Sequence, residues 1–104
     1  NENSYEFAIS VINLFELYTG AFKSHDSETK LKDIEELYKK LKIFSFLLKH
    51  TKEAGKQKAN LEKKGNIIES RDILIGSTAL VEGFPIKTNN KKHFERIEGL
   101  EIVD

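Results

Sequence analysis

The sequence has no cysteine, no methionine and no tryptophan among its 104 residues, and it has a single proline, Pro85. Without cysteine the chain cannot form a disulfide framework, a thiolate metal site or a cysteine nucleophile. The longest apolar stretches, such as residues 43–48, are far shorter than the roughly 20 residues that would span a bilayer. These absences favour a protein of the reducing cytoplasm, and we expect that location.

The chain also lacks an excess of either charge, since 17 basic residues balance 17 acidic ones. Neutral balance gives no electrostatic argument for tight nucleic-acid binding, although a local patch of lysines can still contact phosphates. There is no HExxH metal motif, no GxSxG elbow and no glycine-rich phosphate loop. The scattered His25, His50 and His93 show no metal-type spacing, and we expect them to be surface or turn residues.

Hydrophobic periodicity and turn residues predict helices alternating with short strands. Helices are expected at about residues 11–22, largely buried and with Ser10 as the N-cap, at 27–41, at 51–64, where Gly65 would end the helix, and at 70–82. A short helix is expected within 89–97, and strands are expected at 42–47, 84–87 and 100–103. This alternation is typical of an α/β fold with a mainly parallel central sheet flanked by helices. A chain of this length is the size of one domain, so we expect a single domain over residues 1–104.

Three polar positions are candidates for a functional site, and each has a plainer interpretation. Glu16 shares a helix face with Asn13 and Gly20, which is either a narrow solvated stripe or a carboxylate facing a cleft. Asp72 lies in the first turn of its helix, where a negative charge is favoured by about 0.3–1 kcal/mol whether or not it has another role. Asn90 follows an expected strand, where open α/β sheets bind ligands, but an Asn-rich turn is also typical of loops.

Three stretches, taken together and in this order, resemble a known family. They are "SVINLFELYTGA", "RDILIG" and the segment "STALVEGFPIKTNNKKHFERIEGLEIVD" that follows it. The combination of an ELxxGA helix, a DxLIGxxAL helix and a TxNxxxF turn is similar to PIN-domain proteins of the VapC toxin type. The resemblance covers essentially the whole chain.

The resemblance implies a ribonuclease that depends on Mg²⁺ or Mn²⁺ and whose acidic residues converge at the carboxyl ends of parallel strands. Glu16 of "FELYTG" matches the family's helix glutamate, and Asp72 of "RDILIG" matches its central aspartate. Asn90 falls where members have Asp or Asn, with Thr88 close by. We therefore expect Asp72 to be a metal ligand, Glu16 a ligand or a base that positions water, and Asn90 a weak ligand or a polar neighbour.

The same resemblance implies an RNA substrate, a small VapB-type antitoxin that inhibits the enzyme, and a homodimer. The sequence departs from the family pattern at its N-terminal end. Family members begin with a strand that carries a first aspartate, and that strand is absent from this sequence. Since the chain begins with Asn1 rather than methionine, we expect the strand to belong to an upstream piece.

Two alternatives remain open at this point. An amide at Asn90 instead of an acid, and the absent first aspartate, favour a non-catalytic PIN-like module that binds RNA or a protein. A purely structural α/β domain, with helix caps and solvated acids, is the plainest alternative.

Overall fold

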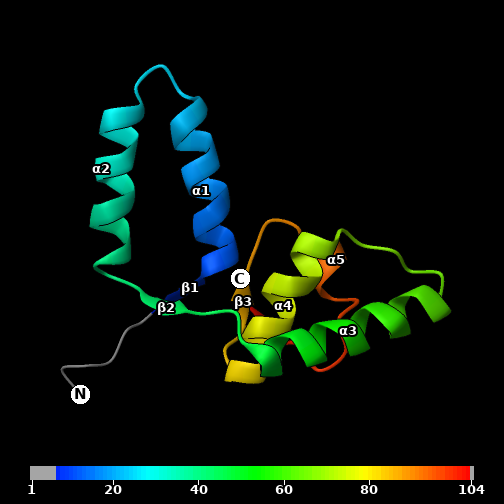
Figure 1. Cartoon of the computed structure of the whole chain (residues 1–104). Coiled ribbons are helices and arrows are strands. Elements are labelled where there is room, and N and C mark those ends of the chain that lie inside the picture. The colour runs from blue at the N-terminus through cyan, green and yellow to red at the C-terminus, as the bar shows by residue number, and fades with distance from the viewer. Residues whose placement is uncertain (1–6, 104) are drawn as a thin grey trace. The chain divides into compact units, whose positions relative to one another are not determined.

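The computed structural model describes residues 7–103, which form helices and short parallel strands (Figure 1). The chain divides into two compact units, Asn1–Ser45 and Phe46–Asp104, and each is described by itself. The α/β class with parallel strands is confirmed. The single domain over residues 1–104 stays a prediction. Within residues 7–103 no helix combines the length and the apolar character that crossing a membrane requires.

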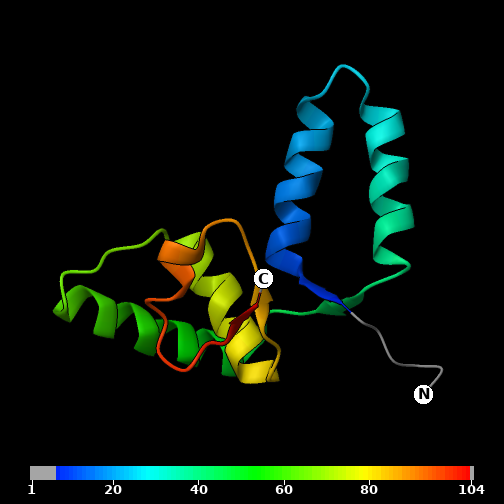
Figure 2. The same ribbon diagram turned by 180° about the vertical axis from the view of Figure 1, so that it is seen from behind.

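The first unit is a helical hairpin attached to a pair of strands. Its elements are β1 (Ala8–Ser10), α1 (Val11–Lys23), α2 (Ser27–Tyr38) and β2 (Lys42–Phe44). The strands β1 and β2 are parallel, with Ile9 opposite Ile43. Helices α1 and α2 lie side by side in both views (Figures 1 and 2). Ala21, Ile34 and Phe44 are the buried apolar residues of this unit.

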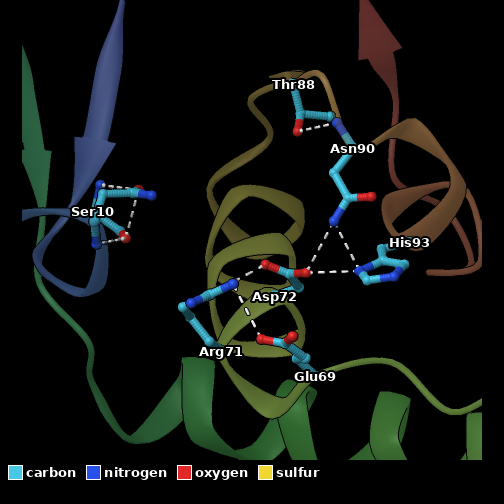
Figure 3. Close-up of polar contacts among 8 residues, drawn as sticks. Ser10, Glu69, Arg71, Asp72, Thr88, Asn90 and His93 are labelled. Atoms are coloured by element: carbon cyan, nitrogen blue, oxygen red, sulfur yellow. Dashed lines mark hydrogen bonds and ion pairs between the residues drawn. The ribbon is translucent and has the colours of Figure 1, made fainter. Parts of the chain in front are cut away.

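Helix α1 begins where the sequence predicts. The hydroxyl oxygen of Ser10 accepts a hydrogen bond from the backbone N–H of Asn13, and the side-chain oxygen of Asn13 accepts one from the backbone N–H of Ser10 (Figure 3). This reciprocal capping satisfies backbone donors that have no partner inside a helix. The N-cap role of Ser10 is therefore confirmed.

The apolar residues of α1 predict a largely buried helix, and this expectation is wrong for the described chain. Ala21 is the buried residue of α1, whereas Phe15 and Phe22 are 70% and 69% exposed. The physical reason is geometric, because a hairpin of two helices covers only the facing side of each helix. The outer apolar side of α1 is left as surface.

The second unit contains the remaining helices and strands. They are α3 (Leu48–Lys63), α4 (Ser70–Glu82), β3 (Ile86–Lys87), α5 (Lys91–Phe94) and β4 (Ile102–Val103). The strands β3 and β4 are parallel, with Ile86 opposite Ile102. Helix α4 has the predicted bounds, because Gly83 adopts a left-handed conformation with φ 75° that ends it. Gly65 likewise follows α3 with φ 71°, as expected.

Helix α3 begins earlier than predicted, at Leu48, and the strand expected over residues 42–47 is correspondingly shorter. His50 explains the difference, since its Nδ1 accepts a hydrogen bond from the backbone N–H of Leu47 at 2.8 Å. Its Nε2 lies 2.7 Å from Oε2 of Glu82 at the end of α4. The expectation of a surface His50 is wrong, because only 1% of it is exposed. His25 is exposed, as expected.

A tight contact positions α5 on α4. A Cβ atom added at Gly76 of α4 would lie 2.4 Å from Cδ1 of Ile97 and 3.3 Å from Cδ1 of Phe94. Ile97 and Phe94 are themselves only 2% and 4% exposed. Glycine therefore allows the segment that carries α5 to approach the helix closely, as its lack of a side chain permits.

Candidate active site

Asp72 is the centre of the candidate site. It occupies the first turn of α4, and only 5% of the residue is exposed. Its carboxylate contacts side chains, namely those of Asn90, His93 and Arg71. The residue at the N-cap position is Glu69, whose side chain makes no capping hydrogen bond. The helix position alone predicts a cap, whereas the observed contacts of Asp72 reach across to another segment.

Asn90 lies beyond the carboxyl end of β3, as predicted, and points toward Asp72 (Figure 3). Its Nδ2 atom is 3.4 Å from Oδ2 of Asp72. Thr88 helps to orient the segment, because its hydroxyl oxygen accepts a hydrogen bond from the backbone N–H of Asn90 at 3.0 Å. Asn90 is also the N-cap residue of α5. Two candidates 18 residues apart in the sequence are thus brought together.

His93 joins the same cluster, a contact that its expected place as a surface or turn residue does not predict. Its Nδ1 atom is 2.9 Å from Oδ2 of Asp72 and 2.8 Å from Nδ2 of Asn90. One signal in the sequence could have found it, because residues three apart at a helix start face the same side. His93 follows Asn90 by three positions. That spacing becomes informative only once Asn90 is known to face Asp72.

Arg71 approaches the other oxygen of the same carboxylate. Its Nε is 3.7 Å from Oδ1 of Asp72, and its guanidinium pairs with Glu69 at 3.0 Å (Figure 3). The two oxygens of Asp72 therefore have different surroundings. Oδ1 faces the guanidinium of Arg71, which also pairs with Glu69. Oδ2 faces the amide of Asn90 and the imidazole of His93.

Glu16 belongs to the first unit, where it is half-buried and interacts with neighbouring groups. With Gly20 it lines a groove of about 450 Å³ between α1 and α2, whose other lining residues are Leu17, Ala21, Lys30, Asp33, Ile34 and Leu37. A carboxylate at a groove, rather than on a fully solvated stripe, is the arrangement that the functional interpretation requires. Its role beside Asp72 and Asn90 stays a prediction.

Within the described residues, no group of three or more His, Asp or Glu side chains is arranged to hold a metal ion. The second unit brings together the carboxylate of Asp72, the amide of Asn90 and the imidazole of His93. Carboxylate and amide oxygens are donors that divalent cations accept in proteins. The fold and the cluster define a class: an α/β protein with a polar site where a strand of a parallel pair ends.

Comparisons with known proteins identify the family within this class. The sequence pattern of the PIN domain matches residues 1–100, which cover the first unit and most of the second. The chain therefore belongs to the PIN-domain family. It is 37% identical to "Ribonuclease VapC2" of Haemophilus influenzae over 96% of this chain and 76% of that protein. It is 34% identical to "tRNA(fMet)-specific endonuclease VapC" of Salmonella typhimurium over 100% of this chain and 79% of the relative.

Solved structures agree with this membership. The VapBC2 complex of Rickettsia felis bound to a DNA fragment from its promoter contains a chain that matches with a TM-score of 0.89 and 37% identity. That match covers 98% of this chain and 76% of the other. At such similarity the fold expected from the sequence motifs is confirmed.

Proposed function

We propose that the protein is a metal-dependent endoribonuclease that cleaves RNA phosphodiester bonds and acts as the toxin of a VapBC-type toxin-antitoxin pair. The relatives named as VapC ribonucleases support this proposal. The single structural observation that carries it is the approach of Asn90 to the buried carboxylate of Asp72. A structural helix cap would not need a second motif residue at this point.

The roles follow from the chemistry of the side chains. Asp72 would be a direct ligand of Mg²⁺ or Mn²⁺, Glu16 would be a second ligand or a base that positions water, and Asn90 would supply a weaker oxygen ligand. A bound divalent cation of this kind lowers the pKa of a water molecule and neutralises charge on the phosphate. Burial holds the Asp72 carboxylate in one orientation, and Thr88 fixes the backbone from which Asn90 reaches it. Such preorganisation is what a catalytic site requires.

The proposed partners are RNA, a VapB-type antitoxin and a second copy of the chain, all in the cytoplasm. Solved VapBC complexes among the structural relatives support the antitoxin. The outer side of α1, with Phe15 and Phe22, offers apolar surface for association, and exposed apolar patches mark interaction sites in many proteins.

Substituting Asp72→Asn tests the proposal, because the amide keeps the size of the side chain and removes its charge. The full-length protein is incubated with RNA and Mg²⁺ or Mn²⁺, and the cleavage rate is measured. We expect at least a 100-fold loss of rate in Asp72→Asn, a magnitude typical of losing a central electrostatic group, and loss of wild-type activity on chelation by EDTA. Glu98→Gln is the matched control, since this glutamate is 77% exposed and should leave the rate unchanged.

Two results would contradict the proposal. Cleavage by Asp72→Asn at the wild-type rate would remove Asp72 from the site. Binding of RNA by the wild-type protein without any cleavage would favour the non-catalytic module instead.

A further inference from the structure

Three polar atoms from three segments form a small triangle. They are Oδ2 of Asp72 in α4, the amide end of Asn90 after β3, and Nδ1 of His93 in α5 (Figure 3). The edges measure 2.9 Å from Asp72 to His93, 2.8 Å from His93 to Asn90, and 3.4 Å from Asn90 to Asp72. The side chains of Asp72 and His93 are 7% and 32% exposed, whereas Asn90 is exposed, so the triangle has one buried corner and opens to solvent at Asn90.

Hydrogen bonding accounts for all three edges in only one arrangement. If Nδ1 of His93 carries a proton, it donates to the Asp72 carboxylate, but the N–H of Asn90 then faces another donor at 2.8 Å. If Nδ1 carries no proton, it accepts from Asn90, but its lone pair then faces the carboxylate oxygen at 2.9 Å. Rotating the amide by 180° puts its oxygen beside the Asp72 carboxylate instead. A protonated Nδ1 then donates to both oxygens, at 2.8 and 2.9 Å, and these oxygens lie 3.4 Å apart, beyond van der Waals contact.

A shared cation can take the place of that single proton. With the amide oxygen of Asn90 turned inward, a carboxylate oxygen, an amide oxygen and an imidazole nitrogen all present lone pairs to one point. Three neighbouring ligands of an octahedral cation, each at about 2.1 Å from the ion, lie about 3.0 Å apart. The observed edges of 2.8, 2.9 and 3.4 Å are close to that spacing.

We propose that His93 is a third ligand, beside Asp72 and Asn90, of the divalent cation that the proposed nuclease uses, and that its imidazole makes the site prefer Mn²⁺ over Mg²⁺. The inference rests on the proposed function for the cation's role. Imidazole nitrogen binds first-row transition metals well, whereas Mg²⁺ takes oxygen ligands. The buried Phe94, next to His93, holds the short helix α5 that carries the imidazole.

Electron paramagnetic resonance of bound Mn²⁺ tests the assignment without reference to RNA cleavage. In the full-length protein, pulsed measurements should detect the ¹⁴N coupling of a coordinated imidazole. His93→Gln keeps an N–H donor for Asp72 but lacks the imidazole, and it should lose that coupling. Its Mn²⁺ affinity should fall at least tenfold, while its Mg²⁺ affinity should change less than about threefold. His25→Gln is the matched control, because His25 is exposed and lies in the first unit.

Bound Mn²⁺ without nitrogen coupling in the wild-type protein would overturn the inference, as would wild-type Mn²⁺ affinity in His93→Gln. Failure to bind Mn²⁺ more tightly than Mg²⁺ would overturn the metal preference. None of these results depends on cleavage. Loss of cleavage in Asp72→Asn together with absent nitrogen coupling would leave the nuclease proposal standing and reject only the ligand role of His93.

Discussion

At the scale of single residues, the His50 and Glu82 pair shows how a buried histidine can fix two helices. Nδ1 of His50 accepts from the backbone at the start of α3, so its Nε2–H donates to the carboxylate of Glu82 at the end of α4. This hydrogen bond is the main reason that the pKa of Glu82 lies below its ordinary value of 4.5; burial opposes the shift and Lys49 assists it. The pair therefore stabilises the fold while Glu82 is ionised.

The lowered pKa of Glu82 predicts acid sensitivity. A carboxyl whose pKa is lower in the folded state than in the unfolded state stabilises the protein fully above its unfolded pKa. That stabilisation is lost as the pH falls from about 5 through the folded pKa. We expect Glu82→Gln to lower the free energy of unfolding by about 1–3 kcal/mol at pH 7. The difference from wild type should shrink toward pH 3, as measured by urea denaturation across this range.

Glu62→Gln is the control for this prediction, because Glu62 is an exposed residue of α3. It should change the free energy of unfolding by less than about 0.5 kcal/mol. A Glu82→Gln effect that stays constant between pH 7 and pH 3 would show that the charge of Glu82 is not what stabilises the pair.

The sequence predicts part of the candidate site at this scale. Asp72 and Asn90 are identifiable from their motifs. Their contact with His93 is not, because it depends on the packing of a short helix against α4 rather than on any local periodicity. His50 was misjudged for the same reason, since its partner Glu82 is 32 residues away.

At the scale of elements, the predictions succeeded where local chemistry decides. Helix α4 has the predicted bounds because a glycine with positive φ ends it, and α1 begins at its predicted serine cap. The start of α3 was missed because a histidine side chain, rather than a conventional capping residue, accepts the backbone N–H of Leu47. The burial of α1 was overestimated because apolar residues on several sides of a helix do not reveal how many neighbours will cover them.

Gly76→Ala tests how closely α5 must approach α4. The added methyl group would meet Ile97, Phe94 and Leu100 at 2.4, 3.3 and 3.4 Å. Overpacking of this kind costs about 1–3 kcal/mol. We expect the urea midpoint to fall accordingly and Mn²⁺ binding to weaken as α5 is displaced.

Gly55→Ala is the matched substitution, because nothing lies within 4 Å of a Cβ added there in the interior of α3. It should raise the free energy of unfolding by up to about 1 kcal/mol, since alanine favours helix over glycine. If Gly76→Ala were as stable as Gly55→Ala, the close approach at Gly76 would not be required.

At the scale of the whole molecule, the PIN-domain pattern spans residues of both units, although the described strands pair as two separate parallel sheets. The family could be predicted from the order of three motifs. The division into two units could not be predicted, because sequence motifs do not show how strongly the segments that carry them contact one another.

The outer face of α1 provides a prediction about assembly. Replacing Phe15 and Phe22 together by serine should leave the free energy of unfolding nearly unchanged, since both side chains are about 70% exposed. The dissociation constant of the proposed homodimer should rise at least tenfold, because buried aromatic residues dominate interface energetics. Sedimentation equilibrium measures this constant.

The control is Ile67→Ser, because Ile67 is 76% exposed and lies in the second unit. Equal weakening of the homodimer by both variants would contradict an interface at α1.

The central claim is that Asp72 and Asn90 belong to one metal-dependent nuclease site. A crystal structure of the full-length protein grown with Mn²⁺ tests it most directly. Two ligands of one octahedral cation lie at most about 4 Å apart, and one bridging water extends that reach by a few ångströms. We predict that Mn²⁺ binds Asp72 and that the side-chain oxygen of Asn90 contacts the ion or one of its waters. Mn²⁺ bound away from Asp72, or an Asn90 amide beyond that reach, would contradict the claim.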